Sequence, residues 1–208
     1  MILYDLTPSE DTPAYRALEV SNLRRQYDFL NSITEASITT GRLYLSSAVI
    51  KAFNYHAIVC LHADAGEYRK YQVKAGQLNP DVWLHVQAQM DDLVNSVNRN
   101  WETTDPVVLA SFALWKICYI HPFRNGNGRT ARLTANYILS LKFGGALAGT
   151  VSLPELLRRQ RGEDNDPYLT ALQAIDASWE AGNLDLTPLV ALMTALLIEQ
   201  AETAPATV

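Results

Sequence analysis

Four times along the chain, a residue that can cap the start of a helix is followed directly by proline. The four pairs are Thr12-Pro13, Asn79-Pro80, Asp105-Pro106 and Thr187-Pro188. The side-chain oxygen of the first residue accepts a backbone N–H that lacks a partner in the first helical turn. Proline loses nothing at the next position by lacking its own N–H. Each pair therefore predicts that a helix begins there.

The segment after Asp105-Pro106 is apolar on nearly all sides of the expected helix. Its apolar residues include Val107, Leu109, Ala110, Phe112, Ala113, Leu114 and Ile117. A helix without a polar face is a buried one, so this segment predicts the central helix of a bundle. Further helices are indicated by the capping-box sequence Ser152-Leu-Pro-Glu155 and by Asp166-Pro167, the second of them ending near Gly182. The predicted fold class is mainly α.

Residues 66–73 (GEYRKYQV) break the helical pattern because they are rich in strand formers, and Lys74-Ala75-Gly76 follows as a candidate turn. We expect a small β-hairpin there. The segment 37–45 is ambiguous, since its Thr and Ile residues favour a strand without alternating. The small, polar residues 201–208 predict a frayed tail.

The composition indicates one domain of an ordinary globular protein, with 208 residues, 48% of them hydrophobic and 19% charged. The net charge of −5 argues against nucleic acid as the main partner, although local arginines still permit a bound nucleotide. We find no signal peptide and no membrane-spanning run. Cys60 and Cys118 lie in apolar surroundings, so we expect reduced, buried thiols and a cytoplasmic protein.

The segment His121-Pro-Phe-Arg-Asn-Gly-Asn-Gly-Arg-Thr-Ala-Arg132 follows the predicted central helix and opens the next one. Residues 126–128 (GNG) allow successive backbone N–H groups to point into one concavity, which can hold an anion. The positive end of the following helix adds to the same site. Arg129 and Arg132 are three residues apart, so both can project from its first turn, and two guanidiniums suit a di- or triphosphate. His121, just before the loop, can take a proton from a hydroxyl near neutral pH.

This segment resembles the signature of the Fic family, His-Pro-Phe-x-acid-Gly-Asn-Gly-Arg-x-x-Arg, and departs from it at one fixed position. Residues 65–69 resemble the family's flap hairpin, and Asn79-Pro80 stands where the family begins its next helix. Further positions resemble the later nucleotide-side helix: Tyr168, Leu172, Asp176 and Gly182. The likeness covers roughly residues 50–200. It implies a Fic-type helical bundle with a β-hairpin flap, a Fic domain over residues 50–200, an N-terminal helical extension over residues 1–49 packed on that core, and a tail over residues 201–208.

The resemblance implies a protein adenylyltransferase that moves AMP from ATP to a Ser, Thr or Tyr hydroxyl of a target protein. His121 would activate the hydroxyl, and Phe123 would fix the loop in the core. The phosphates would be held by Gly126, Asn127, Gly128, Arg129 and Arg132.

Two further sets of residues take roles from the same resemblance. The flap would dock the target chain by strand addition through Gly66, Tyr68, Arg69 and Tyr71. Tyr168 and Asp176 would lie on the base or ribose side, although the family more often has Asn where Asp176 stands.

The departure from the signature is Asn125, which replaces the acid that ligates the nucleotide's Mg²⁺. A neutral amide oxygen is a weaker ligand for a hard cation, so we expect weakened magnesium binding. Three outcomes follow: slower AMP transfer, transfer of another phosphate-containing group by a phosphotransferase reaction, or a nucleotide-binding domain without turnover.

Many Fic proteins are held inactive by a helix with the pattern Ser or Thr, three residues, Glu, then Gly or Asn. The nearest candidate here, Glu35 in Asn31-Ser-Ile-Thr-Glu-Ala36, misses both flanking positions. We therefore interpret Glu35 as an ordinary glutamate near the end of the first long helix. Regulation would then come from a separate partner protein, or there would be none.

Overall fold

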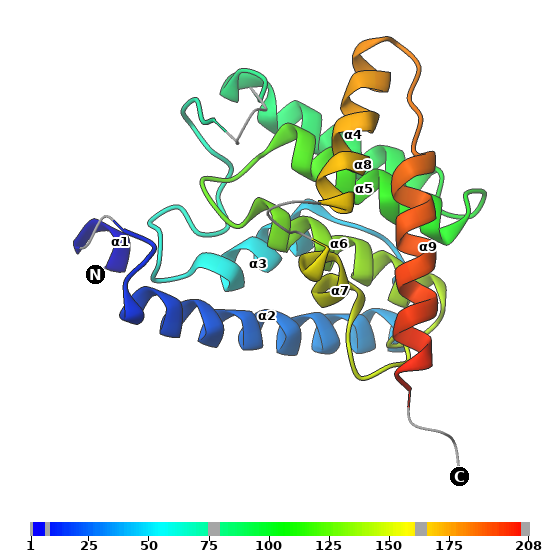
Figure 1. Ribbon diagram of the computed structural model, residues 1–208, viewed down its shortest axis with the longest axis horizontal. Helices are drawn as coiled ribbons and strands as arrows, with labels where there is room; N and C mark the ends of the chain where they lie inside the picture. Colours follow the sequence, from blue (N-terminus) through cyan, green and yellow to red (C-terminus); the bar gives the residue numbers. More distant parts are fainter. Residues whose placement is uncertain (1, 7–8, 75–79, 161–165, 205–208) are drawn as a thin grey trace.

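The computed structural model describes residues 2–6, 9–74, 80–160 and 166–204, and the fold is mainly helical, as predicted (Figure 1). In chain order the elements are α1 (Leu3–Leu6), α2 (Pro13–Thr39), α3 (Ser47–Ile58), the 3-10 turn η1 (Trp83–His85), α4 (Val86–Arg99), α5 (Pro106–Ile120), α6 (Asn127–Lys142), α7 (Leu153–Arg159), α8 (Pro167–Glu180) and α9 (Thr187–Glu202).

The capping residues begin three of these helices as the sequence predicts. Thr12 accepts a hydrogen bond from the Tyr15 N–H at the start of α2. Asp105 caps α5 through the N–H groups of residues 107 and 108, and Asp166 caps α8 through that of residue 169. At the end of α8, Gly182 adopts the left-handed conformation, with φ of +79°, that favours glycine after a helix.

Three predicted helix starts differ in detail. Thr187 is the first residue of α9 rather than its cap, and its N–H donates to Asp185 instead. The capping box at α7 does not form, because the Ser152 hydroxyl bonds to Tyr27 and the Glu155 carboxylate pairs with two arginines, Arg158 and Arg159. Asn79 lies outside the described residues, and the next helix begins only at η1 and α4.

The buried helix α5 forms the centre of the molecule, as its apolar sequence predicts. Its residues Ala110, Ala113, Leu114, Trp115 and Ile117 are fully buried. α5 packs most extensively against α6, and α4, α8 and α9 contact it from other sides. The long α2 packs against α3 and α6, and it lies on the other side of the α5–α6 pair from α4 (Figure 1). The α5–α6 connection therefore lies where α2, α3 and the α5–α6 pair meet.

The predicted β-hairpin is wrong for the residues that the structure describes. Residues 66–74 form turns, bends and irregular backbone rather than a strand, and residues 75–79 fall outside the described part of the chain. The Arg69 N–H donates to the carbonyl of Pro122 (2.8 Å), and the Gln72 side chain donates to the carbonyl of Pro80 (2.6 Å). The segment thus uses its hydrogen bonds to hold the α5–α6 loop and the start of the next element.

Other expectations have mixed outcomes. Cys60 is exposed, contrary to prediction, because it follows α3 in a turn with φ of +63°, whereas Cys118 is half-buried. The ambiguous segment 37–45 contains the end of α2 and a loop. Residues 201 and 202 belong to α9, and residues 205–208 are not described. Within the described ranges, no helix is both long and apolar enough to cross a membrane.

Candidate functional site

The loop between α5 and α6 is bounded by two residues in the left-handed conformation. His121 ends α5 with φ of +51°, and Gly126 precedes α6 with φ of +76°. Gly126 offers no side chain to cap α6, so the N–H groups of its first turn are left for another acceptor. The arrangement matches the predicted one, in which a buried helix, a loop and a new helix N-terminus follow one another, and such an N-terminus can bind an anion.

Gly126 is required by both its conformation and its surroundings. A Cβ atom there would lie 2.9 Å from Cγ2 of Ile58 on α3. The next residue, Asn127, is buried, and its side chain exchanges two hydrogen bonds of 2.9 Å with the backbone of Phe123. The Asn127 side chain therefore braces the loop, and it can contribute its backbone N–H to an anion. Phe123 is fully buried, as predicted.

Two buried polar residues hold the loop from outside: Asn54, which the sequence analysis missed, and Arg69, which it assigned to the flap. Asn54 on α3 donates to the carbonyl of Asn125 (2.9 Å) and accepts the N–H of Gly66 (3.0 Å). Arg69, 2% exposed, donates to the carbonyls of His121 (2.9 Å), Asp81 (2.8 Å) and Tyr71 (3.2 Å). The sequence does contain a signal that Asn54 has a special role, because it is a polar residue on the buried face of α3, beside Ile50, Phe53 and Ala57.

The surroundings of the His121 side chain favour its neutral form. Burial lowers the pKa of this imidazole below its ordinary value, and the nearby Arg69 guanidinium lowers it further, while a hydrogen bond to the backbone of Cys118 acts in the opposite direction. A neutral imidazole can accept a proton from a hydroxyl group. His121 thus has the protonation state that a general base needs at neutral pH.

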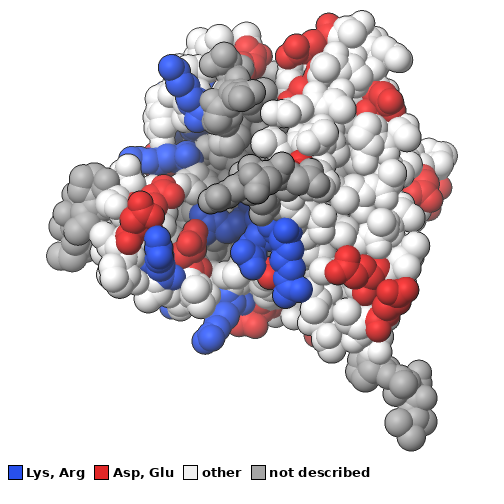
Figure 2. Space-filling model, viewed as in Figure 1, with Lys and Arg blue, Asp and Glu red and all other residues white. Residues whose placement is uncertain are grey.

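The two arginines of α6 have different surroundings. Arg129 pairs with Glu19 of α2 at 2.8 Å and donates to Asn125 at 3.1 Å. Arg132 is 8% exposed, and its guanidinium lies within hydrogen-bonding reach of the Tyr168 hydroxyl. Within the described part of the chain, Arg132 makes no ion pair with an acid. Figure 2 shows Lys and Arg side chains gathered near the middle of this face, over α6 and α7. A negatively charged ligand is favoured at this position.

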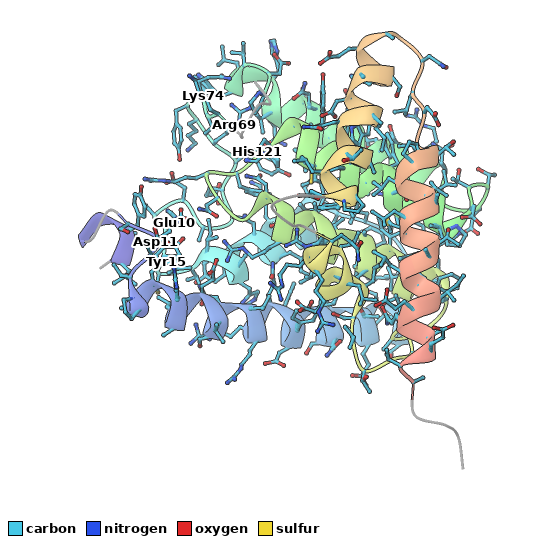
Figure 3. The ribbon with its side chains drawn as sticks, viewed as in Figure 1. Glu10, Asp11, Tyr15, Arg69, Lys74 and His121 are labelled. Carbon is cyan, nitrogen blue, oxygen red and sulfur yellow. The ribbon has the colours of Figure 1, made fainter. Side chains whose placement is uncertain are left out.

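Asn125 faces the N-terminal segment of the chain. Its amide nitrogen donates to the Glu10 carboxylate at 2.8 Å, and its oxygen accepts from Gly126 and Arg129. In Figure 3, Glu10, Asp11 and Tyr15 lie on one side of the loop, and His121 and Arg69 lie on the other. No group of three His, Cys, Asp or Glu side chains that could hold a metal occurs among the described residues. The Asn125 oxygen is also already engaged by Gly126 and Arg129. For both reasons the residues present do not fit a preformed magnesium site.

The four predicted flap residues divide into anchors and one exposed side chain. Gly66 packs closely on α3, since a Cβ atom would meet Tyr55 and the carbonyl of Lys51 at 3.1 Å. Tyr68 is buried against Phe123, with ring centroids 5.3 Å apart, and burial raises its pKa to about 12. Arg69 is used internally, as described above, so its guanidinium is not free for another chain. Tyr71 is exposed, and its hydroxyl bonds to Asp64.

The remaining predicted site residues lie at different distances from the loop. Tyr168 is buried beside Arg132, as a residue of the site should be. Asp176, two turns further along α8, accepts a 2.7 Å hydrogen bond from the indole of Trp115, and burial raises its pKa. Glu35 is exposed on α2 and lines a separate cavity, so in this structure it is not paired with Arg132.

Comparison with known proteins gives a consistent assignment. The family model described as Fic/DOC family matches residues 44–139. A Fido domain-containing protein of Dictyostelium discoideum is 32% identical over 122 residues, which cover 56% of this chain and 76% of that protein. Protein adenylyltransferase fic-1 of Caenorhabditis elegans is 40% identical over 77 residues, or 36% of this chain. The matching part of this chain spans only 15% of that adenylyltransferase and 21% of the length of protein adenylyltransferase Fic of Nematostella vectensis.

Two solved structures share the fold. A Fic domain-containing signaling protein from Bacteroides thetaiotaomicron superposes with a TM-score of 0.72 at 20% identity, over 96% of this chain and 76% of that one. Fic-1 from C. elegans superposes with a TM-score of 0.67 at 26% identity, over 88% of this chain and 49% of that one.

Proposed function

The chain belongs to the Fic/DOC family, and from that premise we propose that it is a protein adenylyltransferase that transfers AMP from ATP to a Ser, Thr or Tyr hydroxyl of a target protein. The names of the C. elegans and N. vectensis relatives support this activity. The observation that carries the proposal is the position of His121 at the end of α5, directly before a helix N-terminus whose first turns carry two arginines.

In the proposed reaction, His121 takes the proton of the target hydroxyl as its oxygen bonds to the α-phosphorus of ATP. The bond between the α-phosphorus and the β-phosphate oxygen breaks, and pyrophosphate leaves. Backbone N–H groups from Asn127 to Arg129 and the Arg132 guanidinium would stabilise the negative charge that develops on the phosphates, while the Gly126 N–H is held by the Asn125 side chain. Tyr168 would hold Arg132 in place, and Arg69 would fix the backbone of His121.

A second function is favoured by Asn125, whose oxygen is engaged by the loop rather than turned toward a ligand. The chain would then bind a nucleotide with little or no turnover, because it lacks the carboxylate that would hold magnesium. The target protein, a regulatory partner and a cytoplasmic location stay predictions.

The test is mass spectrometry of lysate proteins incubated with ATP and the protein, with His121→Ala as the matched control. An added AMP on Ser, Thr or Tyr, lost in His121→Ala, supports the proposed function. An added phosphate would identify a phosphotransferase. No added mass, together with ATP binding by calorimetry, would leave the nucleotide-binding function. AMP transfer that persists in His121→Ala contradicts the role of His121.

A further inference from the structure

At the other end of α6 lies a cavity of about 550 Å³, which is separate from the α5–α6 loop. Its walls are the second halves of α2 and α6, the connection 144–152 and the end of α9. Asn136 of its lining lies nine residues after Asn127, or roughly 13 Å along the helix axis. No residue of the segment 121–132 lines it. Cavities of this size hold small organic ligands.

Two side chains in the lining leave a buried oxygen without a partner among the described residues: Thr34 Oγ1 and Asn136 Oδ1. Thr34 is 5% exposed and Asn136 is 8% exposed. A buried polar atom without a hydrogen bond is costly, and folded proteins usually avoid it. Both oxygens can accept hydrogen bonds, but each has less than 1 Å² of accessible surface, so a donating ligand in the cavity reaches them only when these two side chains rotate.

The walls of the cavity are fixed by tertiary contacts. Gly149 has φ of +121°, and a Cβ atom there would overlap the carbonyl of Gln200 at 2.1 Å. The Gln200 side chain accepts from the N–H of Leu153 (2.6 Å) and donates to the carbonyl of Leu147 (3.3 Å). The Tyr27 hydroxyl bonds to Ser152 at 3.0 Å. The connection 144–152 is thus tied to both α2 and α9, and the cavity is preformed.

The charge of the lining selects the kind of ligand. Among the described lining residues, Glu35 carries the only charge, and none is Lys, Arg or His. Leu30, Ile38 and Leu147 supply apolar surface. We propose that this cavity is a binding site for a small organic ammonium compound, whose charge pairs with Glu35, whose N–H groups bond to Thr34 and Asn136 once these side chains rotate toward it, and whose apolar body packs on the leucine and isoleucine side chains. This site does not depend on the function of the α5–α6 loop.

Binding can be tested with three compounds of similar size and shape: phenethylamine, 2-phenylethanol and 3-phenylpropionate. Calorimetry and amide chemical shifts of the whole chain report affinity and position. We expect the amine to bind roughly tenfold more tightly than the alcohol, because a hydrogen bond to a charged group is stronger than a neutral one, and the carboxylate to bind most weakly. Equal affinities, or shift changes mapping away from α2 and the connection 144–152, would overturn the proposal.

Two variants locate the site. Glu35→Gln should abolish the preference for the amine, whereas Glu180→Gln, at the exposed end of α8, should keep it. Gly145→Phe should weaken binding of all three compounds, since Gly145 lines the cavity and a Cβ atom there meets nothing within 4 Å, so the bulky ring is tolerated beside the site. If the amine still binds to a folded Gly145→Phe protein with unchanged affinity, the cavity is not the site.

Thr34→Val tests the unpartnered hydroxyl by itself, because valine keeps the shape and removes the polar atom. The Tm of the unliganded protein should rise and the affinity for phenethylamine should fall. A lowered Tm with unchanged affinity would show that the hydroxyl has a structural partner, and would contradict the inference.

Discussion

At its first turn α6 meets a loop whose polar side chains are paired, whereas near its last turn it borders a cavity in which two buried oxygens are not. Around the loop, Asn54 of α3, Asn127 of α6 and Arg69 each make two or more hydrogen bonds to backbone atoms. In the cavity, Thr34 and Asn136 retain unpaired atoms. The loop is held rigidly so that its outward-facing groups are positioned, and the cavity holds its unpaired groups inside. α6 therefore takes part in two different sites: a loop fixed by paired polar groups, and a cavity beside two buried polar atoms that have no partner among the described residues.

The largest effect should come from His121→Ala. Loss of a general base lowers the rate by roughly 10²–10⁴, while ATP affinity should hardly change because the imidazole meets the incoming hydroxyl. AMP incorporation and calorimetry measure the two quantities. Glu35→Gln, on α2 in the cavity that borders the other end of α6, should leave both unchanged, and a joint loss would show that the loop and the cavity are not independent.

Gly126 and Gly144 flank α6 and have the same φ of +76°, so they form a matched pair. Gly126→Ala adds a Cβ close to Ile58, whereas at Gly144 it meets nothing within 4 Å. We expect the free energy of unfolding to fall by about 2–4 kcal/mol for Gly126→Ala, from backbone strain and overpacking, and by about 1–2 kcal/mol for Gly144→Ala, from strain alone. Urea denaturation measures both. Equal losses would mean that the loop end is no more tightly packed than the cavity end.

Arg132→Ala should reduce ATP affinity by roughly tenfold to a hundredfold, because a buried guanidinium without an acidic partner is available to phosphate. The control is Arg158→Ala, since Arg158 is paired with Glu155 and should matter less. Calorimetry with ATP checks both variants. Comparable losses would place phosphate binding nearer to α7 than to the loop.

The smallest effect concerns Asn125→Asp, which places a second carboxylate beside Glu10. Turnover at low magnesium should rise by roughly a few-fold, and the gain should shrink as magnesium increases, since two carboxylates hold the cation better than one. Kinetics across a magnesium series, repeated with Glu10→Gln, measure the change. If the unmodified protein is active and Asn125→Asp has no effect at any magnesium concentration, residue 125 takes no part in binding the nucleotide donor or its metal.

The parts that could be predicted from the sequence are those set by neighbouring residues. Thr12, Asp105 and Asp166 cap helices through N–H groups two or three residues away, and the order of helix, loop and new helix around residues 121–132 follows from one short segment, whereas the left-handed conformation of His121 was not predicted. The hairpin was mispredicted because residues 66–73 have strand composition, yet they bond to Pro122 and Pro80 rather than to a second strand.

The cavity could not be predicted, for a related reason. Its lining comes from α2, α6, α9 and one connection, so Thr34 and Asn136 meet only after the chain has folded. Arg69 was assigned to an exposed flap, since nothing in its neighbours shows that carbonyls of residues 81 and 121 surround it.

The burial of Arg69 has a consequence for the order in which the molecule opens. The Arg69 guanidinium joins the end of α5, the segment 66–74 and residue 81, so none of the three can move away without breaking a hydrogen bond to this side chain. Loops usually exchange their amide hydrogens through small, independent openings. Here the amide of Arg69 itself, bonded to Pro122, should exchange only when the α5–α6 connection unfolds with it, at a rate close to that of the central helices.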